Sequence, residues 1–179
     1  MNQDPAAIRE LVAARVRDIP DFPQPGVMFK DITPLLADPA AFQATVAYLG
    51  QRLQDLGAEV VVGIEARGFV LAAPAAVVAG IGLVPQRKPG KLPGKTLRQA
   101  YALEYGEAAL EMHHDAIRPG SRVVIMDDVL ATGGTARAAG DLVERAGGEV
   151  LGYSFLIELD GLGGRAKLPG RRIDSLLRC

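Results

Sequence analysis

The stretch VVIMDDVLATGGTA, residues 123–136, decides the fold class that this sequence predicts. Its first four residues are apolar and typical of a buried strand. Two acids, Asp127 and Asp128, end this strand, and a short loop with two glycines leads into a helix expected over about 135–146. A strand, a glycine loop and a helix in direct succession are typical of an open α/β sheet, in which ligands bind beyond the carboxyl ends of the strands.

The loop after the acids has the composition of a binding site for a phosphorylated sugar. The start of a helix offers free backbone N–H groups and the positive end of its dipole, which suit a phosphate. Gly133 and Gly134 allow a close backbone approach, and Thr132 and Thr135 add hydroxyl donors. The acids repel phosphate but accept hydrogen bonds from sugar hydroxyls. A ribose 5-phosphate therefore fits the loop; the alternative is a tight turn beside a solvated acid pair.

Strand and helix patterns alternate along the rest of the chain. Asp4 and Asp38 are each followed by proline, a combination of N-cap and first-turn residue that predicts a helix start. A third helix is expected from Gly68, with a bend at Pro74. Short apolar runs predict strands over 59–65, 82–86, 122–127, 150–159 and 173–177. The alternation predicts an α/β fold with a mainly parallel central sheet flanked by helices.

Several segments have turn or loop patterns instead. Residues 18–30 contain three prolines and a glycine, which predict a loop of defined shape and exclude a helix or a central strand. Residues 87–95 hold four cations, two prolines and two glycines, and predict an exposed, mobile loop. An alternating pattern over 101–112 predicts a hairpin, and a Gly-rich loop over 161–164 precedes the last strand.

The composition fits one globular domain without a nucleic-acid or membrane partner. The chain has 179 residues, 49% of them hydrophobic, which suits a single domain over 1–179. Its 20 Lys and Arg against 21 Asp and Glu argue against broad binding of nucleic acid or anionic membranes. The single cysteine, Cys179, allows no intrachain disulfide. The N-terminal stretch is unlike a secretory leader and the apolar run 68–83 is short for a membrane span, so we expect a cytoplasmic protein.

The stretch 123–135 resembles the phosphoribosyl pyrophosphate signature of type I phosphoribosyltransferases. It consists of four apolar residues, two acids, three further residues and Thr-Gly-Gly-Thr. The resemblance implies the type I phosphoribosyltransferase fold, with a small N-terminal hood over about 19–36. It also implies that Asp127 and Asp128 bind the ribose hydroxyls. The 5-phosphate would then lie within the loop formed by Ala131, Thr132, Gly133, Gly134 and Thr135.

A second motif narrows the family. Residues 65–69, Glu-Ala-Arg-Gly-Phe, follow the first buried strand and resemble the pyrophosphate loop of adenine phosphoribosyltransferases. The resemblance implies that Arg67 contacts pyrophosphate and that the peptide bond before Arg67 is cis. Without the resemblance, this segment is a turn with one cation, and Arg67 could equally be a surface residue.

Residues 86–97 and 101–106 together resemble the catalytic loop of the same family. The resemblance implies that Arg87, Lys88 and Lys91 lie near the pyrophosphate, and mobile cations could close over such a ligand and exclude water. Glu104 would be the acid/base residue that acts on the purine, and Tyr105 would close or position the loop. The alternative is a solvated cationic loop beside an exposed carboxylate.

A fourth segment resembles the family's adenine-recognising hood. Phe29 would stack on the base, and Met28 and Lys30 would offer it backbone groups. Many relatives carry Arg in place of Lys30, and the two side chains differ in geometry. Leu159 would cover the opposite face of the base. Phe29 could equally be a core residue.

The resemblance, which spans about residues 19–177, implies a pentosyltransferase of purine salvage that forms AMP from adenine and phosphoribosyl pyrophosphate. Mg²⁺ would be held mainly by substrate and water, without a dedicated set of protein ligands, and a homodimer is expected. The adjacent His113 and His114 have no further ligand at the spacing of a transition-metal site. Two rivals remain open: a phosphoribosyltransferase for a 6-oxopurine, and a non-catalytic regulator that senses phosphoribosyl pyrophosphate.

Overall fold

The computed structural model of the chain describes residues 4–102 and 106–179. The chain folds into two compact units, Met1–Tyr48 and Leu49–Cys179. The expected α/β fold with a parallel sheet is confirmed, and this sheet lies within the second unit.

The N-terminal unit consists of helices and one small hairpin. Asp4 caps the first helix as predicted: its side chain accepts a hydrogen bond from Ala6 N at 3.0 Å. Ile8 and Val12 form the buried face of this helix. The elements of the unit are α1 (Pro5–Ala13), β1 (Arg17–Ile19), β2 (Phe29–Asp31), α2 (Thr33–Ala37) and the first part of α3 (Pro39–Asp55).

The segment predicted as a loop over 18–30 is paired at both of its ends. β1 and β2 are antiparallel, with Asp18 opposite Lys30. All three prolines lie in the turn between the strands, so the strand residues keep the N–H groups that pairing requires. Within this turn, Asp21 Oδ1 accepts a hydrogen bond from Gly26 N at 2.8 Å. The loop prediction therefore holds for the turn, while the ends of the segment are short strands.

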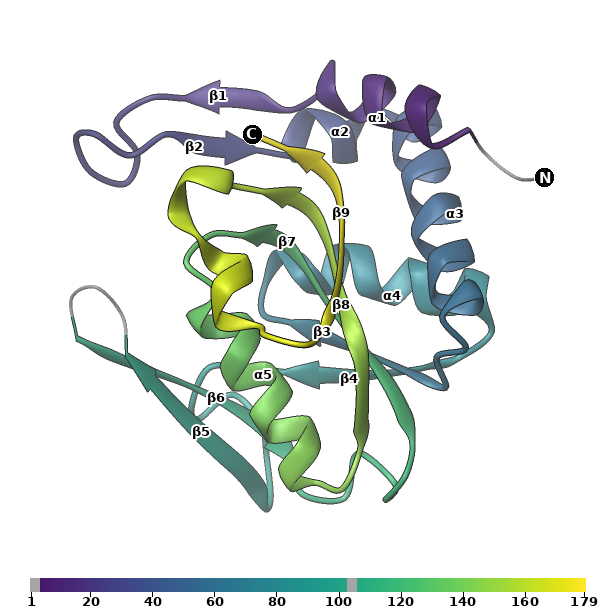
Figure 1. Cartoon of the computed structure of the whole chain (residues 1–179), viewed down its shortest axis with the longest axis vertical. Helices are drawn as coiled ribbons and strands as arrows, with labels where there is room; N and C mark the ends of the chain where they lie inside the picture. Colours follow the sequence, from purple (N-terminus) through teal and green to yellow (C-terminus); the bar gives the residue numbers. More distant parts are fainter. Residues whose placement is uncertain (1–3, 103–105) are drawn as a thin grey trace. The chain divides into compact units, whose positions relative to one another are not determined.

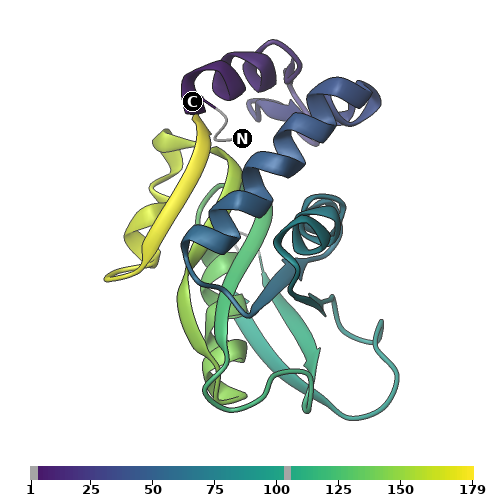
Figure 2. The same ribbon diagram turned by 90° about the vertical axis from the view of Figure 1, so that its right-hand side faces the viewer.

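The second unit is built on a five-stranded parallel sheet, with the order β4-β3-β7-β8-β9 (Figure 1). Every predicted strand of this sheet is present, and β9 forms one edge (Figure 2). The strands are β3 (Val60–Ile64), β4 (Gly82–Gln86), β7 (Arg122–Leu130), β8 (Glu149–Glu158) and β9 (Arg172–Arg178).

The order in which successive strands are added to the sheet reverses between β3 and β7, although all strands are parallel. The connection from β3 runs outward to β4, whereas the connection from β7 runs to β8 on the other side. Because such crossovers are right-handed, their helices, α4 (Arg67–Ala79) and α5 (Gly134–Arg145), cover opposite faces of the sheet (Figure 1). This reversal makes β3 and β7 the switch point of the sheet, and open α/β sheets bind ligands beyond the carboxyl ends of the strands at such a point.

The apolar run 68–83 forms most of α4 and the start of β4. As predicted, Pro74 lies inside the helix. The helix ends at Gly80, which has a φ of 72°. Across residues 4–102 and 106–179, no helix is long and apolar enough to cross a lipid bilayer.

A hairpin and two short 3-10 helices complete the second unit. β5 (Thr96–Ala102) and β6 (Glu107–His113) are antiparallel, which confirms the hairpin, although its first strand begins before residue 101. The helix α5 packs between this hairpin and the sheet, where Leu142 and Val143 are fully buried. The Gly-rich segment predicted as a loop contains η1 (Asp160–Leu162) and η2 (Gly164–Lys167).

Candidate functional site

The two acids lie within β7 and not at its end. β7 pairs with β3 as far as Met126, but its pairing with β8 continues to Leu130. The sequence therefore predicted the end of this strand too early, because the long partner β8 extends the ladder past the acids. Asp127 and Asp128 therefore lie in the part of β7 that pairs with β8 but no longer with β3.

The first turn of α4 lies against the acid pair. Arg67 Nε is 2.8 Å from Asp128 Oδ2, and the Asp128 side chain is only 5% exposed. Despite this ion pair, no donor among the described residues reaches Asp128 Oδ2 with hydrogen-bond geometry. A Cβ at Gly68 would lie 2.9 Å from Asp127 Oδ1 and 3.0 Å from Met126 O, so only glycine allows α4 to approach so closely.

The electrostatics of the pair differ from those of exposed acids. Burial raises the pKa of Asp127 well above its ordinary value, and the neighbouring charge of Asp128 raises it further. The hydrogen bond that Asp127 Oδ1 accepts from Asp128 N, at 2.9 Å, and the Arg67 charge act in the opposite direction. The site is therefore pre-arranged for groups that donate hydrogen bonds or carry positive charge to these carboxylates.

The loop between β7 and α5 lines a pocket together with the end of β7. Gly133 has a φ of 80° and is the N-cap of α5, so the loop turns into the helix through a conformation that favours glycine. The helix start directs its first N–H groups toward this loop. The residues that line the pocket are Asp127, Val129, Leu130, Ala131, Thr132, Gly133, Thr135, Ala136 and Phe155.

The pocket includes most of the predicted ribose 5-phosphate site. Asp127 and the loop residues Ala131, Thr132, Gly133 and Thr135 line it. Asp128 and Gly134 belong to the same strand and helix start without lining the pocket itself.

The resemblance implied a cis peptide bond between Ala66 and Arg67, and this prediction is wrong by one residue. The cis bond joins Glu65 to Ala66, one residue before the expected position. Ala66 is the N-cap of α4 and its carbonyl accepts a hydrogen bond from Phe69 N at 3.2 Å, so the peptide before Arg67 already belongs to the helical turn.

The Glu65 carboxylate, for which the sequence predicted no role, binds the first residues of the cationic segment 87–95. Glu65 accepts hydrogen bonds from Arg87 Nε at 3.2 Å and from Lys88 N at 2.9 Å. Burial by itself raises the pKa of Glu65, but these two partners outweigh it, and the pKa is lowered overall. Lys88 and Lys91 are exposed, as predicted for this loop. Glu65 lies two residues before Arg67 in the same motif. Glu65 contacts Arg87 of the cationic loop and Arg67 contacts Asp128 of the acid pair, so the motif connects the two.

The end of β5 contacts the phosphate loop, the loop over 131–135 that is the predicted site of the 5-phosphate. Thr135 Oγ1 donates a hydrogen bond to Tyr101 OH at 3.3 Å. A Cβ at Gly134 would lie 3.5 Å from Ala102 O, in ordinary contact. Tyr101 is the first residue of the segment 101–106, for which the family resemblance implies roles only at Glu104 and Tyr105. The proposed catalytic residues, Glu104 and Tyr105, lie outside the described residues.

The predicted base-binding residues lie in both units. In the first unit, Met28 is 48% exposed, and the Phe29 ring lies edge-on to Phe22 with centroids 5.1 Å apart. Lys30 Nζ donates to Asp18 Oδ1 at 2.7 Å. In the second unit, Leu159 follows β8, and its N–H donates to Leu130 O at 2.9 Å.

A parallel sheet with an acid pair, a glycine loop and a cationic helix start at its switch point defines the class of type I phosphoribosyltransferases. The family model of the phosphoribosyl transferase domain matches residues 31–167. An adenine phosphoribosyltransferase of Acidothermus cellulolyticus is 60% identical over 97% of this chain and 98% of the relative. The chain belongs to the adenine phosphoribosyltransferase family.

Solved structures agree with this assignment. The adenine phosphoribosyltransferase of Rhodothermus marinus has a TM-score of 0.91 and 50% identity, covering 97% of this chain and 99% of that one. The enzyme of Saccharomyces cerevisiae, solved with an imino-altritol bisphosphate and adenine, has a TM-score of 0.90 and 39% identity. It covers 96% of this chain and 99% of that one.

Proposed function

We propose that this protein transfers the 5-phosphoribosyl group of phosphoribosyl pyrophosphate to adenine, giving AMP and pyrophosphate, in cytoplasmic purine salvage. The observation that carries the proposal is the pocket at the end of β7, where the acid pair, the glycine loop and the start of α5 meet. The whole chain, 1–179, would act as one phosphoribosyltransferase domain, with residues 19–36 as its hood.

Ribose 5-phosphate fits this pocket by charge and by hydrogen bonding. The 5-phosphate binds in the loop over 131–135, where the backbone N–H groups of the helix start and the hydroxyls of Thr132 and Thr135 can donate to it. The ribose hydroxyls donate to Asp127 and Asp128. The high pKa that burial gives Asp127 makes this carboxylate a strong acceptor once it is ionised.

The pyrophosphate binds to cations outside this loop. Arg67 lies beside Asp128, so a group attached to the ribose on the acid pair lies within its reach. Arg87, Lys88 and Lys91 add further positive charge, with Arg87 and Lys88 anchored on Glu65. As the bond from the anomeric carbon to the pyrophosphate oxygen breaks, negative charge grows on the leaving group, and these cations stabilise it.

Adenine takes the place of pyrophosphate on the anomeric carbon. A ring nitrogen forms the new bond, and the proton that the base must lose passes to Glu104. Tyr105 positions the loop that carries Glu104. Phe29 stacks on the base, Met28 and Lys30 read it through their backbone groups, and Leu159 covers its other face. The yeast relative, solved with adenine, supports the choice of base.

The site fits Mg²⁺ held mainly by substrate and water. The described residues contain no group of three or more His, Cys, Asp or Glu side chains that could hold a metal ion. Asp128 Oδ2 is buried and accepts no hydrogen bond from the described residues, so it keeps a lone pair for a ligand or for ligand-bound water. When bound, the cation neutralises pyrophosphate charge.

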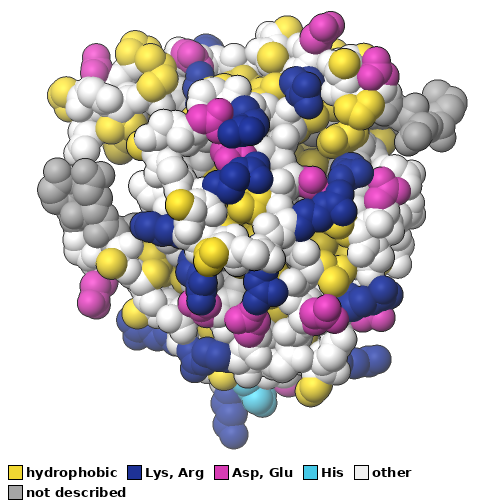
Figure 3. Space-filling view, viewed as in Figure 1, with side chains coloured by type: hydrophobic (Ala, Val, Ile, Leu, Met, Phe, Trp, Pro, Cys, Tyr) yellow, Lys and Arg dark blue, Asp and Glu magenta, His cyan; other side chains and the backbone are white. Residues whose placement is uncertain are grey.

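A second copy of this chain is the expected partner. Val70, Val77 and Val78 on α4, with Leu83 on β4, are apolar and between 37% and 81% exposed. An apolar surface of this kind suits a homodimer interface. Nucleic acid is not an expected partner: on the face shown in Figure 3, Lys and Arg side chains are interspersed with Asp and Glu.

Nucleotide formation from four bases tests the proposal. Purified protein with Mg²⁺ and phosphoribosyl pyrophosphate is offered adenine, hypoxanthine, guanine and xanthine separately. We expect AMP as the dominant product, lost in Glu104→Ala and kept in Glu107→Ala, which removes an exposed carboxylate at the start of β6. Turnover of a 6-oxopurine in preference to adenine would overturn the base assignment. Binding of phosphoribosyl pyrophosphate without any turnover would favour a sensor.

A further inference from the structure

The segment after β8 packs directly against the phosphate loop. A Cβ at Gly164 would overlap the carbonyl oxygen of Ala131 and lie 3.0 Å from Leu130 Cδ1. From the other side, a Cβ at Gly133 would overlap the carbonyl oxygen of Gly164. The two backbones are therefore closer than any side chain allows, and the shape of the loop over 131–133 depends on where Gly164 lies.

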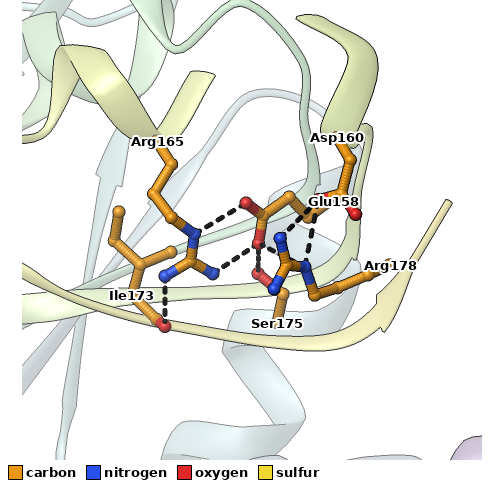
Figure 4. A network of polar contacts seen from close by, with 6 residues as sticks. All are labelled: Glu158, Asp160, Arg165, Ile173, Ser175 and Arg178. Atoms are coloured by element: carbon orange, nitrogen blue, oxygen red, sulfur yellow. Dashed lines mark hydrogen bonds and ion pairs between the residues drawn. The ribbon is translucent and has the colours of Figure 1, made fainter. Parts of the chain in front are cut away.

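An ion pair between the exposed guanidinium of Arg165 and the buried carboxylate of Glu158 fixes the residue that follows Gly164 (Figure 4). Arg165 donates to Glu158 through both Nε, at 2.7 Å to Oε1, and Nη2, at 2.5 Å to Oε2. The Glu158 side chain is only 4% exposed. A bidentate pair of this kind fixes orientation as well as distance.

The same carboxylate is anchored on the sheet. Glu158 is the last residue of β8, and its Oε2 accepts a further hydrogen bond from Ser175 Oγ on β9 at 2.7 Å (Figure 4). Arg165 Nη1 donates to Ile173 O on β9 at 3.2 Å. Two strands of the sheet thus hold Arg165, and Arg165 holds Gly164 through one peptide bond.

We propose that Glu158 and Arg165 are positioning residues that hold Gly164 against residues 131–133 and keep the phosphate loop in its binding conformation. The proposal rests on the proposed function, in which this loop binds the 5-phosphate. A loop that is already ordered loses less entropy on binding, so loosening it weakens affinity without removing any contact to the ligand. The effect is specific to ligands with a 5-phosphate, because the pyrophosphate cations lie on other segments.

Calorimetric titration with two ligands separates this role from general stability. Ribose 5-phosphate uses the loop, whereas pyrophosphate with Mg²⁺ uses the cations. We expect Gly164→Ala and Glu158→Gln to weaken ribose 5-phosphate binding roughly ten- to a hundred-fold, the range that a small misplacement of binding groups produces. Pyrophosphate affinity should stay within about two-fold, a free-energy change of less than about 0.5 kcal/mol.

Gly161→Ala is the matched control, since a Cβ there meets nothing within 4 Å, and it should change neither affinity. Unchanged ribose 5-phosphate binding in folded Glu158→Gln overturns the proposal, and so does an equal loss for both ligands. If Gly164→Ala does not fold, the result for Glu158→Gln decides alone. Failure of the unsubstituted protein to bind ribose 5-phosphate would instead overturn the proposed function.

Discussion

Arg67 Nε and Asp128 Oδ2 lie 2.8 Å apart, which joins the proposed pyrophosphate cation directly to the proposed ribose-binding pair. The two residues come from different strand ends, since Arg67 follows β3 and Asp128 lies on β7. The contact therefore links the two strands on either side of the switch point of the sheet. It also means that a change at Arg67 alters the charge balance of the acid pair as well as the pyrophosphate site.

We predict that Arg67→Gln weakens phosphoribosyl pyrophosphate binding at least about ten-fold, the effect of losing about 1.4 kcal/mol of interaction. It should also lower the free energy of unfolding by about 1–3 kcal/mol, because the buried Asp128 carboxylate loses its counter-charge. Calorimetric titration and urea unfolding measure the two effects. Arg137→Gln breaks the more exposed Arg137–Asp141 pair on α5 and should cost under about 1 kcal/mol. Equal stability losses in the two variants would contradict the prediction.

The acid pair predicts a trade-off between stability and binding. Because the folded pKa of Asp127 is raised, the folded state holds a proton that the unfolded state releases at the same pH. Stability therefore falls as the pH rises from the ordinary aspartate pKa through the raised value. We expect Asp127→Asn to unfold at a higher temperature than the unsubstituted protein at neutral pH. This advantage should disappear toward acid, below the ordinary aspartate pKa. A variant that is less stable at neutral pH would contradict this.

Ligand binding should depend on the same ionisation with the opposite sign. The ionised carboxylate is the better acceptor for ribose hydroxyls, so affinity for ribose 5-phosphate rises as the pH rises through the raised pKa of Asp127. Titration of affinity against pH should show this increase in the unsubstituted protein and lose it in Asp127→Asn. Pyrophosphate binding serves as the control, because Asp127 is not among the groups proposed to bind pyrophosphate. A flat ribose 5-phosphate profile would contradict the proposed role of Asp127.

Local sequence determined the elements of the site but not the contacts between them. The apolar residues before Asp127 and the glycines at 133–134 identified the strand, the loop and the helix start. The length of β7 was missed, because its last residues depend on pairing with β8, more than twenty residues further along the chain.

The supporting residues were missed for the same reason. Glu65 acts on Arg87, 22 residues away, and its role follows from the sheet that places Ile64 beside Gln86. Gly164 lies in a glycine-rich segment typical of any loop, and only the packing shows that its missing side chain makes room for Ala131. Glu65 belongs to the motif over 65–69, but the motif does not show that its carboxylate binds Arg87.

The exposed valines on α4 predict an oligomer that a single charge disrupts. Val77 is 81% exposed, so Val77→Arg should change the free energy of unfolding by less than about 0.5 kcal/mol. Burying an arginine without a partner in an apolar interface is unfavourable, so the variant should be monomeric by light scattering where the unsubstituted protein is dimeric. Leu162→Arg, on η1 and 52% exposed, is the matched control and should leave the mass unchanged. A monomeric unsubstituted protein would contradict the prediction.

We predict that replacing Glu65 weakens pyrophosphate binding selectively. In Glu65→Gln, the amide oxygen can still accept a hydrogen bond from Lys88 N, but the charge that holds the Arg87 guanidinium is lost. The root of the cationic loop then loosens, and Arg87 keeps only weaker contacts, such as its position 6.0 Å from the Phe69 ring centroid. We expect pyrophosphate affinity to fall roughly three- to ten-fold, as for loss of a partly exposed ion pair. Ribose 5-phosphate affinity should change less than about two-fold.

The matched control for Glu65 is Glu149→Gln, which neutralises an exposed carboxylate at the start of β8 and should alter neither affinity. The lowered pKa of Glu65 fixes the pH dependence: its contribution is complete above the ordinary glutamate pKa and is lost as the pH falls through the lowered value. The difference between Glu65→Gln and the unsubstituted protein should therefore be largest at neutral pH and shrink in acid. If Glu65→Gln bound pyrophosphate more tightly, Glu65 would be a competitor of the ligand for Arg87 and not its anchor.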